Sequence, residues 1–517
     1  MKFVDTRTGK DLEIDSFKAV LEGKVSEGLI VMQDFPKAFT ADEIQSFFDV
    51  TFTDLAIEVL SRFFSDISKE KIVEFCHKAY DKDCFDPDKE VLPVVHIKDD
   101  IFCIEQWHGK TAAFKDIPLS VLPYFISEAL DIENQKTGKK EKILLLGATS
   151  GDTGSAGQAG FYNIKDAFVA ILYPEKGKVS YIQKQQMINF QSDDGRICAY
   201  SVLDNFDYCQ NKVVKPLLED NEFKKSLKEK YSVRVSSLNS INIGRIGPQV
   251  VSSFQAYRKI APYIGDRSFD ICVPTGNFGH ILSAYFAKKM GIPIRKMIIA
   301  TNANDVLYRF IATGVYEPKE FKTTISPSMD IAVSSNLERL LYYLQGAEKT
   351  KKYMEDLSRD GFFKADDELM SILKEEFAAN FASEEETKAQ IKKTWKNQKR
   401  LLDPHSAVAM CVAEKEKEPN TPMVFCETAH WSKFTQTIHD ILNPESQKED
   451  GAWSIDYIDE LDAELEKIEA RPRATYFMKS LNTGNKSPKM QGIKPTSEEM
   501  KEILYKQIKE ALGGYNS

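Results

Sequence analysis

Apolar positions follow two alternating patterns along most of the chain. Short runs rich in Val, Ile and Phe, which are typical of buried strands, alternate with segments whose apolar residues recur at helical spacing. The strand-like runs occupy residues 91–97, 101–107, 168–174, 196–203, 294–302 and 423–430. Strands that alternate with helices indicate parallel sheets covered by helices on both faces. The pattern therefore predicts an α/β protein.

Three regions depart from this alternation. Residues 1–95 contain short helical patterns with aromatic runs and predict an N-terminal helical region. Residues 346–400 are highly charged and helix-prone, which favours a solvated helical insertion outside the sheet. Residues 441–517 carry further charged helical patterns, so we expect a C-terminal helical extension there.

Composition excludes several classes of protein. The chain has 517 residues, 42% of them hydrophobic and 28% charged, and can therefore bury large cores. No apolar run reaches the ~18 residues that a membrane-spanning helix needs. The formal net charge is −9 and no basic cluster is interleaved with aromatic residues, which argues against nucleic-acid binding. The N-terminal sequence MKFVDTRTGKDLEID is charged where a secretory signal is apolar, and predicts a cytoplasmic location.

Cysteine and histidine spacing gives no metal signature. The eight cysteines are scattered without a CxxC pair, and the seven histidines show no HxxxH spacing. Cysteines arranged in this way are typical of reduced core thiols. These observations favour an enzyme without a bound metal.

The segment HGKTAAFKD (108–116) contains the first candidate for chemistry. Lys115 follows a run of small residues and Phe114. Apolar surroundings lower the pKa of an amine, so a neutral Lys115 could act as nucleophile or base. An ordinary surface lysine is the alternative.

Two glycine-containing loops each lie between a predicted strand and a predicted helix. They are GATSGDTG (147–154) and PTGNFGH (274–280). Free backbone amides at a helix N-terminus can bind an anion, and neither loop matches the GxGxxG or Walker pattern. The alternative for each loop is a plain turn with a helix cap.

The segment CETAHWSKF (426–434) follows the last predicted strand. Its Thr428 lies at the sheet edge where open α/β folds bind ligands, and its hydroxyl could hydrogen-bond a heterocycle nitrogen. His405 and His430 are expected to be hydrogen-bonded structural histidines. Arg245 either clamps a phosphate or forms a structural ion pair.

Eight segments in this order resemble threonine synthase of the fungal and bacterial type, a pyridoxal-phosphate enzyme family with the tryptophan-synthase-β-like fold (fold type II). The matching segments are His108–Asp116, Gly147–Gly154, Asn239–Asn242, Pro274–Gly279, Ala300–Asp305, Ser335–Arg339, Asp403–Val408 and Thr428–His430. Lys110, His280 and Trp431 stand where the family usually has Pro, Asp or Asn, and Pro.

The resemblance implies two open, mostly parallel twisted sheets covered by helices. It implies a larger cofactor domain formed by residues 96–145 and 233–440, and a smaller mobile domain formed by residues 146–232. The smaller domain would close over the substrate.

The resemblance also implies the role of each site residue. Lys115 would hold pyridoxal 5'-phosphate as a Schiff base, the glycine loop would bind the cofactor phosphate, and Thr428 would face the pyridine nitrogen. The implied cofactor-binding residues are Phe114, Lys115, Gly276, Asn277, Phe278, Gly279, His280 and Thr428. The implied substrate-binding residues are Thr149, Ser150, Gly151, Asp152, Thr153, Asn239 and Arg245.

The implied activity is that of a lyase of threonine biosynthesis. Its partner would be a small anionic phosphorylated amino acid, O-phosphohomoserine, which γ-elimination and β-addition of water convert to threonine and phosphate. One alternative is a threonine-synthase-like phospho-lyase that releases 2-oxobutanoate. The other is a pyridoxal-phosphate-binding protein without catalytic activity. An intact Lys115 argues against this last alternative.

Overall fold

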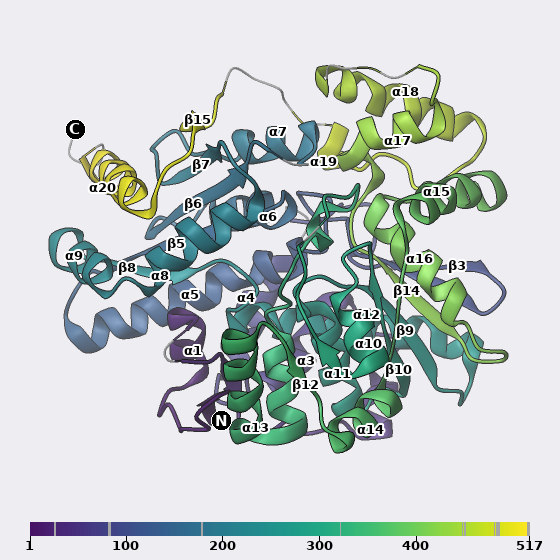
Figure 1. The fold of residues 1–517 in the computed structure, drawn as a ribbon, viewed down its shortest axis with the longest axis horizontal. Coiled ribbons are helices and arrows are strands. Elements are labelled where there is room, and N and C mark those ends of the chain that lie inside the picture. Colours follow the sequence, from purple (N-terminus) through teal and green to yellow (C-terminus); the bar gives the residue numbers. More distant parts are fainter. Residues whose placement is uncertain are drawn as a thin grey trace.

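The chain folds around two mainly parallel β-sheets with helices packed over them (Figure 1). A computed structural model describes residues 1–24, 27–80, 84–176, 179–320, 322–446, 448, 451–479, 481 and 486–513. Among the described helices, none combines the length and the apolar character needed to cross a membrane. The expected α/β class with two open parallel sheets is confirmed.

The six-stranded sheet has the order β13–β10–β9–β14–β4–β3. All neighbouring strands in it are parallel except β3 and β4, which pair in antiparallel fashion. Its strands are β3 (Val94–Lys98), β4 (Ile101–Glu105), β9 (Phe269–Pro274), β10 (Ile294–Thr301), β13 (Phe377–Phe381) and β14 (Met423–Glu427).

The charged insertion is not wholly outside this sheet, as the sequence pattern suggested. Its segment FAANF forms the edge strand β13 and pairs in parallel with β10. Phe377 at the start of β13 is buried, so a short apolar run within a charged region is drawn into the sheet. The helices on either side of β13 keep the predicted charged and partly solvated character.

The five-stranded sheet has the order β15–β7–β6–β5–β8, and all its strands are parallel. They are β5 (Lys142–Ala148), β6 (Ala167–Pro174), β7 (Ile197–Val202), β8 (Val233–Ser237) and β15 (Met490–Ile493). The expected smaller domain, residues 146–232, contains β6, β7 and only the last part of β5, whereas β8 begins at the residue after its end. β15 comes from the C-terminal extension, whose last helix, α20 (Ser497–Gly513), packs beside α9 (Asn221–Tyr231) (Figure 1).

Most helices lie in the connections between these strands or in the N-terminal and C-terminal regions. The helices are α1 (Ser16–Glu22), α2 (Ala41–Ser46), α3 (Phe52–Phe63), α4 (Lys69–Tyr80), α5 (Asp116–Thr137), α6 (Asp152–Phe161), α7 (Tyr181–Asn189), α8 (Lys215–Glu219), α9 (Asn221–Tyr231), α10 (Gly247–Ile264), α11 (Gly279–Lys289), α12 (Val306–Thr313), α13 (Leu337–Asp360), α14 (Asp367–Glu376), α15 (Glu384–Gln398), α16 (Pro404–Glu416), α17 (Thr435–Leu442), α18 (Ser454–Lys467), α19 (Tyr476–Lys479) and α20 (Ser497–Gly513). Shorter elements are β1 (Phe3–Asp5), β2 (Ile30–Met32), β11 (Val315–Tyr316), β12 (Phe363–Lys364), the π-helix η1 (Tyr208–Val214) and the 3-10 turns η2 (Ile243–Arg245), η3 (Pro327–Met329), η4 (Trp431–Phe434) and η5 (Gly451–Trp453).

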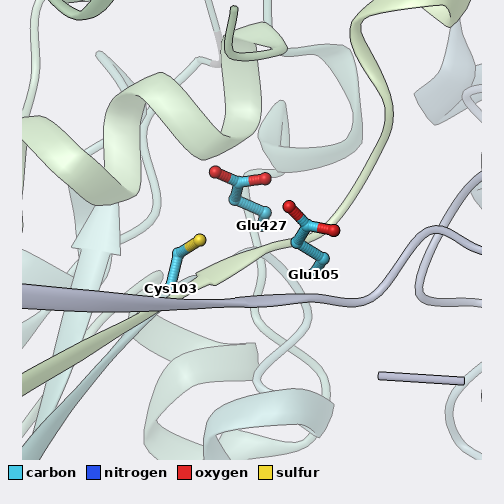
Figure 2. A group of neighbouring side chains, drawn as sticks. All are labelled: Cys103, Glu105 and Glu427. Atoms are coloured by element: carbon cyan, nitrogen blue, oxygen red, sulfur yellow. The ribbon is translucent and has the colours of Figure 1, made fainter. Parts of the chain in front are cut away.

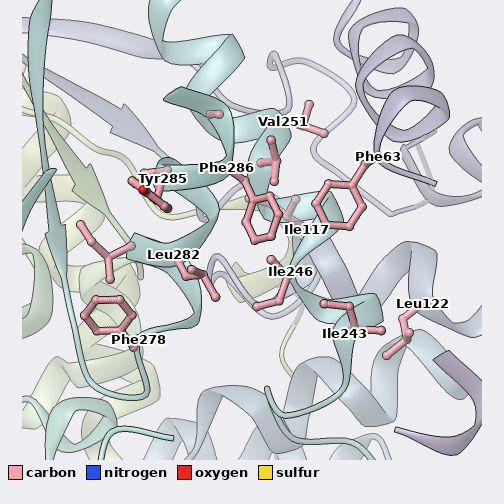
Figure 3. Packing of buried hydrophobic residues seen from close by; sticks show 14 of the residues in the cluster. Phe63, Ile117, Leu122, Ile243, Ile246, Val251, Phe278, Leu282, Tyr285 and Phe286 are labelled. Carbon is pink, nitrogen blue, oxygen red and sulfur yellow. The ribbon is translucent and has the colours of Figure 1, made fainter. Parts of the chain in front are cut away.

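One hydrophobic core fixes the loops that carry the candidate chemistry. Figure 3 shows Phe63 of α3 packed with residues from the loops and helices near the six-stranded sheet. Ile117 follows Lys115 by two residues, Ile246 follows Arg245 directly, and Phe278 belongs to the glycine loop. Because interiors are close-packed, these neighbours restrict where the polar side chains beside them can lie. The N-terminal helical region thus helps to hold the candidate site.

Candidate functional site

A single cavity lies at the carboxyl ends of strands from both sheets. The loops that follow β4, β9 and β14 reach it from the six-stranded sheet, and the loop that follows β5 reaches it from the five-stranded sheet. Ligands of open α/β folds bind at such strand ends. The predicted residues that line it are Phe114, Lys115, Thr149, Ser150, Asp152, Thr153, Asn239, Arg245, Gly276, Asn277, Phe278, Gly279, His280 and Thr428.

Lys115 lies at the N-terminus of α5, immediately after the loop that follows β4. Its Nζ is 3.8 Å from the centroid of the Phe114 ring. Burial lowers the pKa of the amine to about 7; Asp152 opposes this shift, whereas Arg245 and Lys433 add to it. A substantial fraction of Lys115 is therefore neutral near pH 7, as a nucleophile or base requires.

The loop after β9 passes unusually close to another backbone segment. A Cβ atom on Gly276 would lie 2.9 Å from the carbonyl oxygen of Ser328. Ser334 Oγ donates to the Gly276 carbonyl at 2.6 Å, and Asn336 Nδ2 donates to the Asn277 carbonyl at 2.8 Å. The first amides of α11 have no acceptor within the helix. The loop therefore has the features of an anion-binding cradle.

The loop after β5 is held by its own hydroxyl group. Thr149 Oγ1 accepts hydrogen bonds from the backbone N–H of Gly151 at 2.9 Å and of Gly154 at 3.0 Å. Gly151 has φ +135°, a conformation that favours glycine. It is the one predicted site residue that does not line the cavity, and a Cβ there would collide with the side chain of Gln183. Its placement supports a role in the turn instead of the expected substrate contact.

Asp152 is a buried carboxylate at the start of α6. Its Oδ1 accepts a hydrogen bond from Gln183 Nε2 at 2.9 Å and lies 3.1 Å from Lys433 Nζ. Its Oδ2 accepts from Ser328 Oγ at 3.3 Å. Burial alone raises the pKa of this carboxyl, but the charges of Lys433 and Lys115 outweigh burial and hold the pKa well below its usual range.

Arg245 presents a buried positive charge that pairs with no carboxylate in the described part of the chain. The side chain is 1% exposed, and Nη1 donates to the Leu238 carbonyl at 2.8 Å. Its Nε has no hydrogen-bond partner, and no ion pair joins it to any described acidic residue. Burial lowers the pKa of the guanidinium to about 10. No structural ion pair of Arg245 is found among the described residues, so the phosphate clamp stays a prediction.

Phe114 and His280 form part of the cavity wall. Their rings are stacked, with centroids 4.8 Å apart and an interplanar angle of 16°. Burial, with a smaller contribution from Lys115, lowers the pKa of His280 to about 3, so His280 is neutral. Lys110 and Trp431 do not line the cavity, and Trp431 instead donates its Nε1–H to the Pro472 carbonyl at 2.9 Å.

Thr428 follows β14 directly, and both its backbone N–H and its backbone carbonyl form hydrogen bonds. Its N–H donates to Ser406 Oγ at 3.2 Å, and its carbonyl accepts from the Phe114 N–H at 2.8 Å. His430 is buried and contacts Ser432 Oγ and the Arg473 carbonyl, consistent with the expected structural role. His405 is likewise buried and hydrogen-bonded, with Nδ1 2.7 Å from Asp403 Oδ2, and it also lines the cavity. Its Nε2 accepts from the Ser328 N–H at 3.1 Å.

Several residues around the cavity escaped the sequence analysis. Ser240 lies within the NSIN segment and Lys433 within CETAHWSKF, so both segments were noticed but these side chains were not singled out. No pattern marked the others, which approach from distant parts of the chain. They are Phe206, Gln249 and the segment from Pro327 to Ile331.

A second cluster of buried charges lies beside this cavity. Figure 2 shows Cys103, Glu105 and Glu427, whose ligand atoms lie within 4.8 Å of one another. Arg400 donates to Glu105 Oε1 at 2.6 Å and to both Glu427 oxygens at 2.6 Å. Burial raises the pKa of the Cys103 thiol well above its usual value. Because a guanidinium already pairs with both carboxylates and the thiol stays protonated, this cluster is poorly suited to a metal.

Known protein families match both ends of the chain. A model described as threonine synthase N terminus matches residues 2–80, and one described as threonine synthase, C-terminal, matches residues 406–484. Human threonine synthase-like 1 is 37% identical over 446 residues, which are 82% of this chain. The chain spans only 58% of that relative's length. Threonine synthase of Saccharomyces cerevisiae is 34% identical over 85% of this chain and 88% of its own length.

Solved structures agree with these sequence matches. Yeast threonine synthase superposes with a TM-score of 0.83 and 30% identity over 99% of both chains. Pyridoxal-phosphate-bound threonine synthase of Brucella melitensis gives a TM-score of 0.80 and 33% identity, over 98% of this chain and 99% of its own. The motifs, the fold and these relatives all agree, and the chain belongs to the threonine synthase family.

Proposed function

We propose that the protein is a pyridoxal-phosphate-dependent threonine synthase, a lyase that converts O-phosphohomoserine and water to threonine and phosphate. One observation carries the proposal. A single cavity gathers a lysine of lowered pKa, a glycine loop at a helix N-terminus, a threonine at a strand end and an unpaired arginine, in a chain of this family.

The residues present fit the cofactor. The Gly276 backbone lies too close to Ser328 for a side chain, as expected where a loop closes around a phosphate group. The amides of Gly276–Gly279 would bind the cofactor phosphate, Lys115 would hold the cofactor covalently, and the Thr428 hydroxyl would face the ring nitrogen. Phe114 and His280 would flank the cofactor.

When bound, the cofactor withdraws electrons from the substrate and stabilises negative charge at Cα. Lys115 Nζ accepts the proton that leaves Cα and supplies protons in later steps. A pKa near 7 suits both roles, because the amine is present in neutral and protonated forms at the same pH.

The remaining polar groups orient an anionic substrate. Arg245 binds an anionic group of the substrate, since its guanidinium has no carboxylate partner among the described residues. Asn239 Oδ1 is buried without a partner and is free to accept a hydrogen bond from the substrate. The hydroxyls of Thr149, Ser150 and Thr153 line the same cavity and offer donors to the substrate carboxylate.

The test is to incubate the protein with pyridoxal phosphate and O-phosphohomoserine and to quantify threonine, phosphate and 2-oxobutanoate separately. Threonine and phosphate in equal amounts, both lost in Lys115→Ala, are expected. Release of phosphate together with 2-oxobutanoate would change the assignment from a synthase to a phospho-lyase. No phosphate release, despite a cofactor absorbance band, would leave a cofactor-binding protein with a different role.

A further inference from the structure

Lys433 is a fully buried lysine beside the cavity whose role the proposed function does not explain. It lies in η4, five residues after Thr428, and none of its side chain is exposed. Its Nζ donates to the Thr111 carbonyl at 2.6 Å and to Gln186 Oε1 at 2.8 Å, and it pairs with Asp152 Oδ1 at 3.1 Å. These three contacts use all three N–H donors of an ammonium group. Lys433 therefore has no donor left for a ligand.

The three partners come from both sides of the cavity. Thr111 belongs to the loop that carries Lys115 and follows β4 of the six-stranded sheet. Asp152 and Gln186 lie on α6 and α7, which follow β5 and β6 of the five-stranded sheet. One ammonium thus joins the loop of the reactive lysine to the loop expected to contact the substrate.

Lys433 also acts on Lys115 through charge. The charged or titratable groups that face Lys115 are Asp152 from α6, Arg245 from η2, Lys433 from η4 and neutral His280 from α11. Asp152 favours the protonated form of Lys115, whereas Lys433 opposes it both directly and by pairing with Asp152. Burial is the largest cause of the lowered Lys115 pKa, and loss of the Lys433 charge would remove one of the groups that oppose Asp152 and so raise that pKa.

We propose that Lys433 is a positioning residue of the reaction, which fixes the Asp152 carboxylate against the Lys115 loop and keeps the Lys115 amine neutral. This inference rests on the proposed function, in which the neutral amine captures pyridoxal phosphate and later accepts a proton. Removing the charge of a buried neighbour such as Lys433 is expected to shift the pKa of Lys115 by roughly one pH unit or more.

The experiment measures the rate at which the full chain, freed of cofactor, captures pyridoxal phosphate as a function of pH, followed by absorbance. Only the neutral amine reacts, so the parent rate is expected to rise through a midpoint near pH 7. Lys433→Met is expected to raise the midpoint by roughly one unit, with about tenfold slower capture below pH 7. Asp152→Asn is expected to move the midpoint in the opposite direction.

Two further variants separate charge from packing. Lys433→Arg keeps the charge and is expected to stay close to the parent midpoint. Lys349→Met removes a surface lysine paired with Asp366 and Glu368 and is expected to leave the midpoint unchanged. If Lys433→Met does not fold, Asp152→Asn still tests the pair from its other side.

A folded Lys433→Met or Asp152→Asn variant with the parent midpoint would overturn the inference, and so would a parent that does not capture the cofactor. The proposed function fails separately. A parent that captures pyridoxal phosphate but makes no threonine removes the synthase assignment, while the opposite shifts of the two variants would still support the role of Lys433.

Discussion

Two clusters of buried charge lie next to each other in this fold and differ in how completely they are neutralised. In the first, Arg400 pairs with both Glu105 and Glu427, and His108 Nε2 contacts Glu105 Oε2 at 2.8 Å. In the second, around the cavity, Asp152 pairs with Lys433 and its pKa is also lowered by the charge of Lys115, while Arg245 has no acidic partner among the described residues. Glu427 and Thr428 are consecutive residues, so one strand end serves both clusters.

The difference suggests separate roles, because the Arg400 cluster fits a structural role and the cavity fits the proposed anion binding. A buried charge without a partner is costly, so a closed cluster such as that of Arg400 holds the ends of β4 and β14 together. The cavity instead keeps positive charge that the described residues do not neutralise. Binding of an anion would offset the free-energy cost of burying this charge, and the proposed cofactor and substrate each carry a phosphate group.

Breaking the closed cluster should have the largest effect on stability. Arg400→Met leaves two buried carboxylates without their cation, and loss of one partner of a buried pair costs about 3–5 kcal/mol. Chemical denaturation with a constant m-value measures this loss. The matched control is Arg359→Met, an exposed arginine paired with Asp356 and Asp360, for which little change is expected.

The second prediction concerns the cost of burying Lys115. Its pKa falls from 10.5 in the unfolded chain to about 7 in the fold, so between these values the unfolded state binds more protons. Stability therefore rises with pH in this window, and the penalty is complete below pH 7. In cofactor-free protein, Lys115→Met should be the more stable variant at pH 6, and its advantage should shrink by about 1–3 kcal/mol at pH 9. Denaturation at the two pH values tests this, and an advantage independent of pH would contradict the lowered pKa.

The third prediction removes the unpaired cation. Arg245→Met should lower kcat/KM for O-phosphohomoserine by about tenfold to a hundredfold, because a hydrogen bond to a charged group is worth about 1.5–3 kcal/mol. Its unfolding free energy should stay the same or rise, since the substitution removes an uncompensated buried charge. Unfolding and steady-state kinetics on the same preparation measure both quantities. A large loss of stability would show that Arg245, like Arg400, has a mainly structural role.

The smallest effect is expected from two glycines of one loop. A Cβ at Gly276 would lie 2.9 Å from the Ser328 carbonyl, whereas a Cβ at Gly279 has its nearest neighbour at 3.6 Å. Gly276→Ala should shift the loop and weaken pyridoxal phosphate binding by about tenfold, a cost of about 1–2 kcal/mol for overpacking. Gly279→Ala should weaken binding less, and equilibrium dialysis compares the two. Equal effects would indicate that close backbone approach does not limit the cradle.

The sequence predicted those parts of the site that local patterns encode. A strand, a glycine turn and a helix follow one another within about twenty residues at both 142–161 and 269–289, so both loops could be placed at strand ends. Lys115 was singled out by its small and apolar neighbours, and Thr428 by its place just after a strand-like run. β13 was missed because FAANF becomes a strand through pairing with β10, and nothing in its charged surroundings signals that partner.

Long-range charge pairing could not be predicted. Lys433 and Thr111 are separated by 322 positions, and Arg400 and Glu105 by 295. Residue type alone does not say whether a buried arginine meets two carboxylates, like Arg400, or none among the residues that the structure describes, like Arg245. Only the packed fold distinguishes the closed cluster from the open one.

The most direct test of this distinction is a calorimetric titration of cofactor-free protein with inorganic phosphate. The parent should bind phosphate, Arg245→Met should bind it much more weakly, and Arg400→Met should retain the parent affinity at a temperature where it remains folded. Equal affinities of the parent and Arg245→Met would contradict the account, because the cavity's unpaired cation would then not serve to bind an anion.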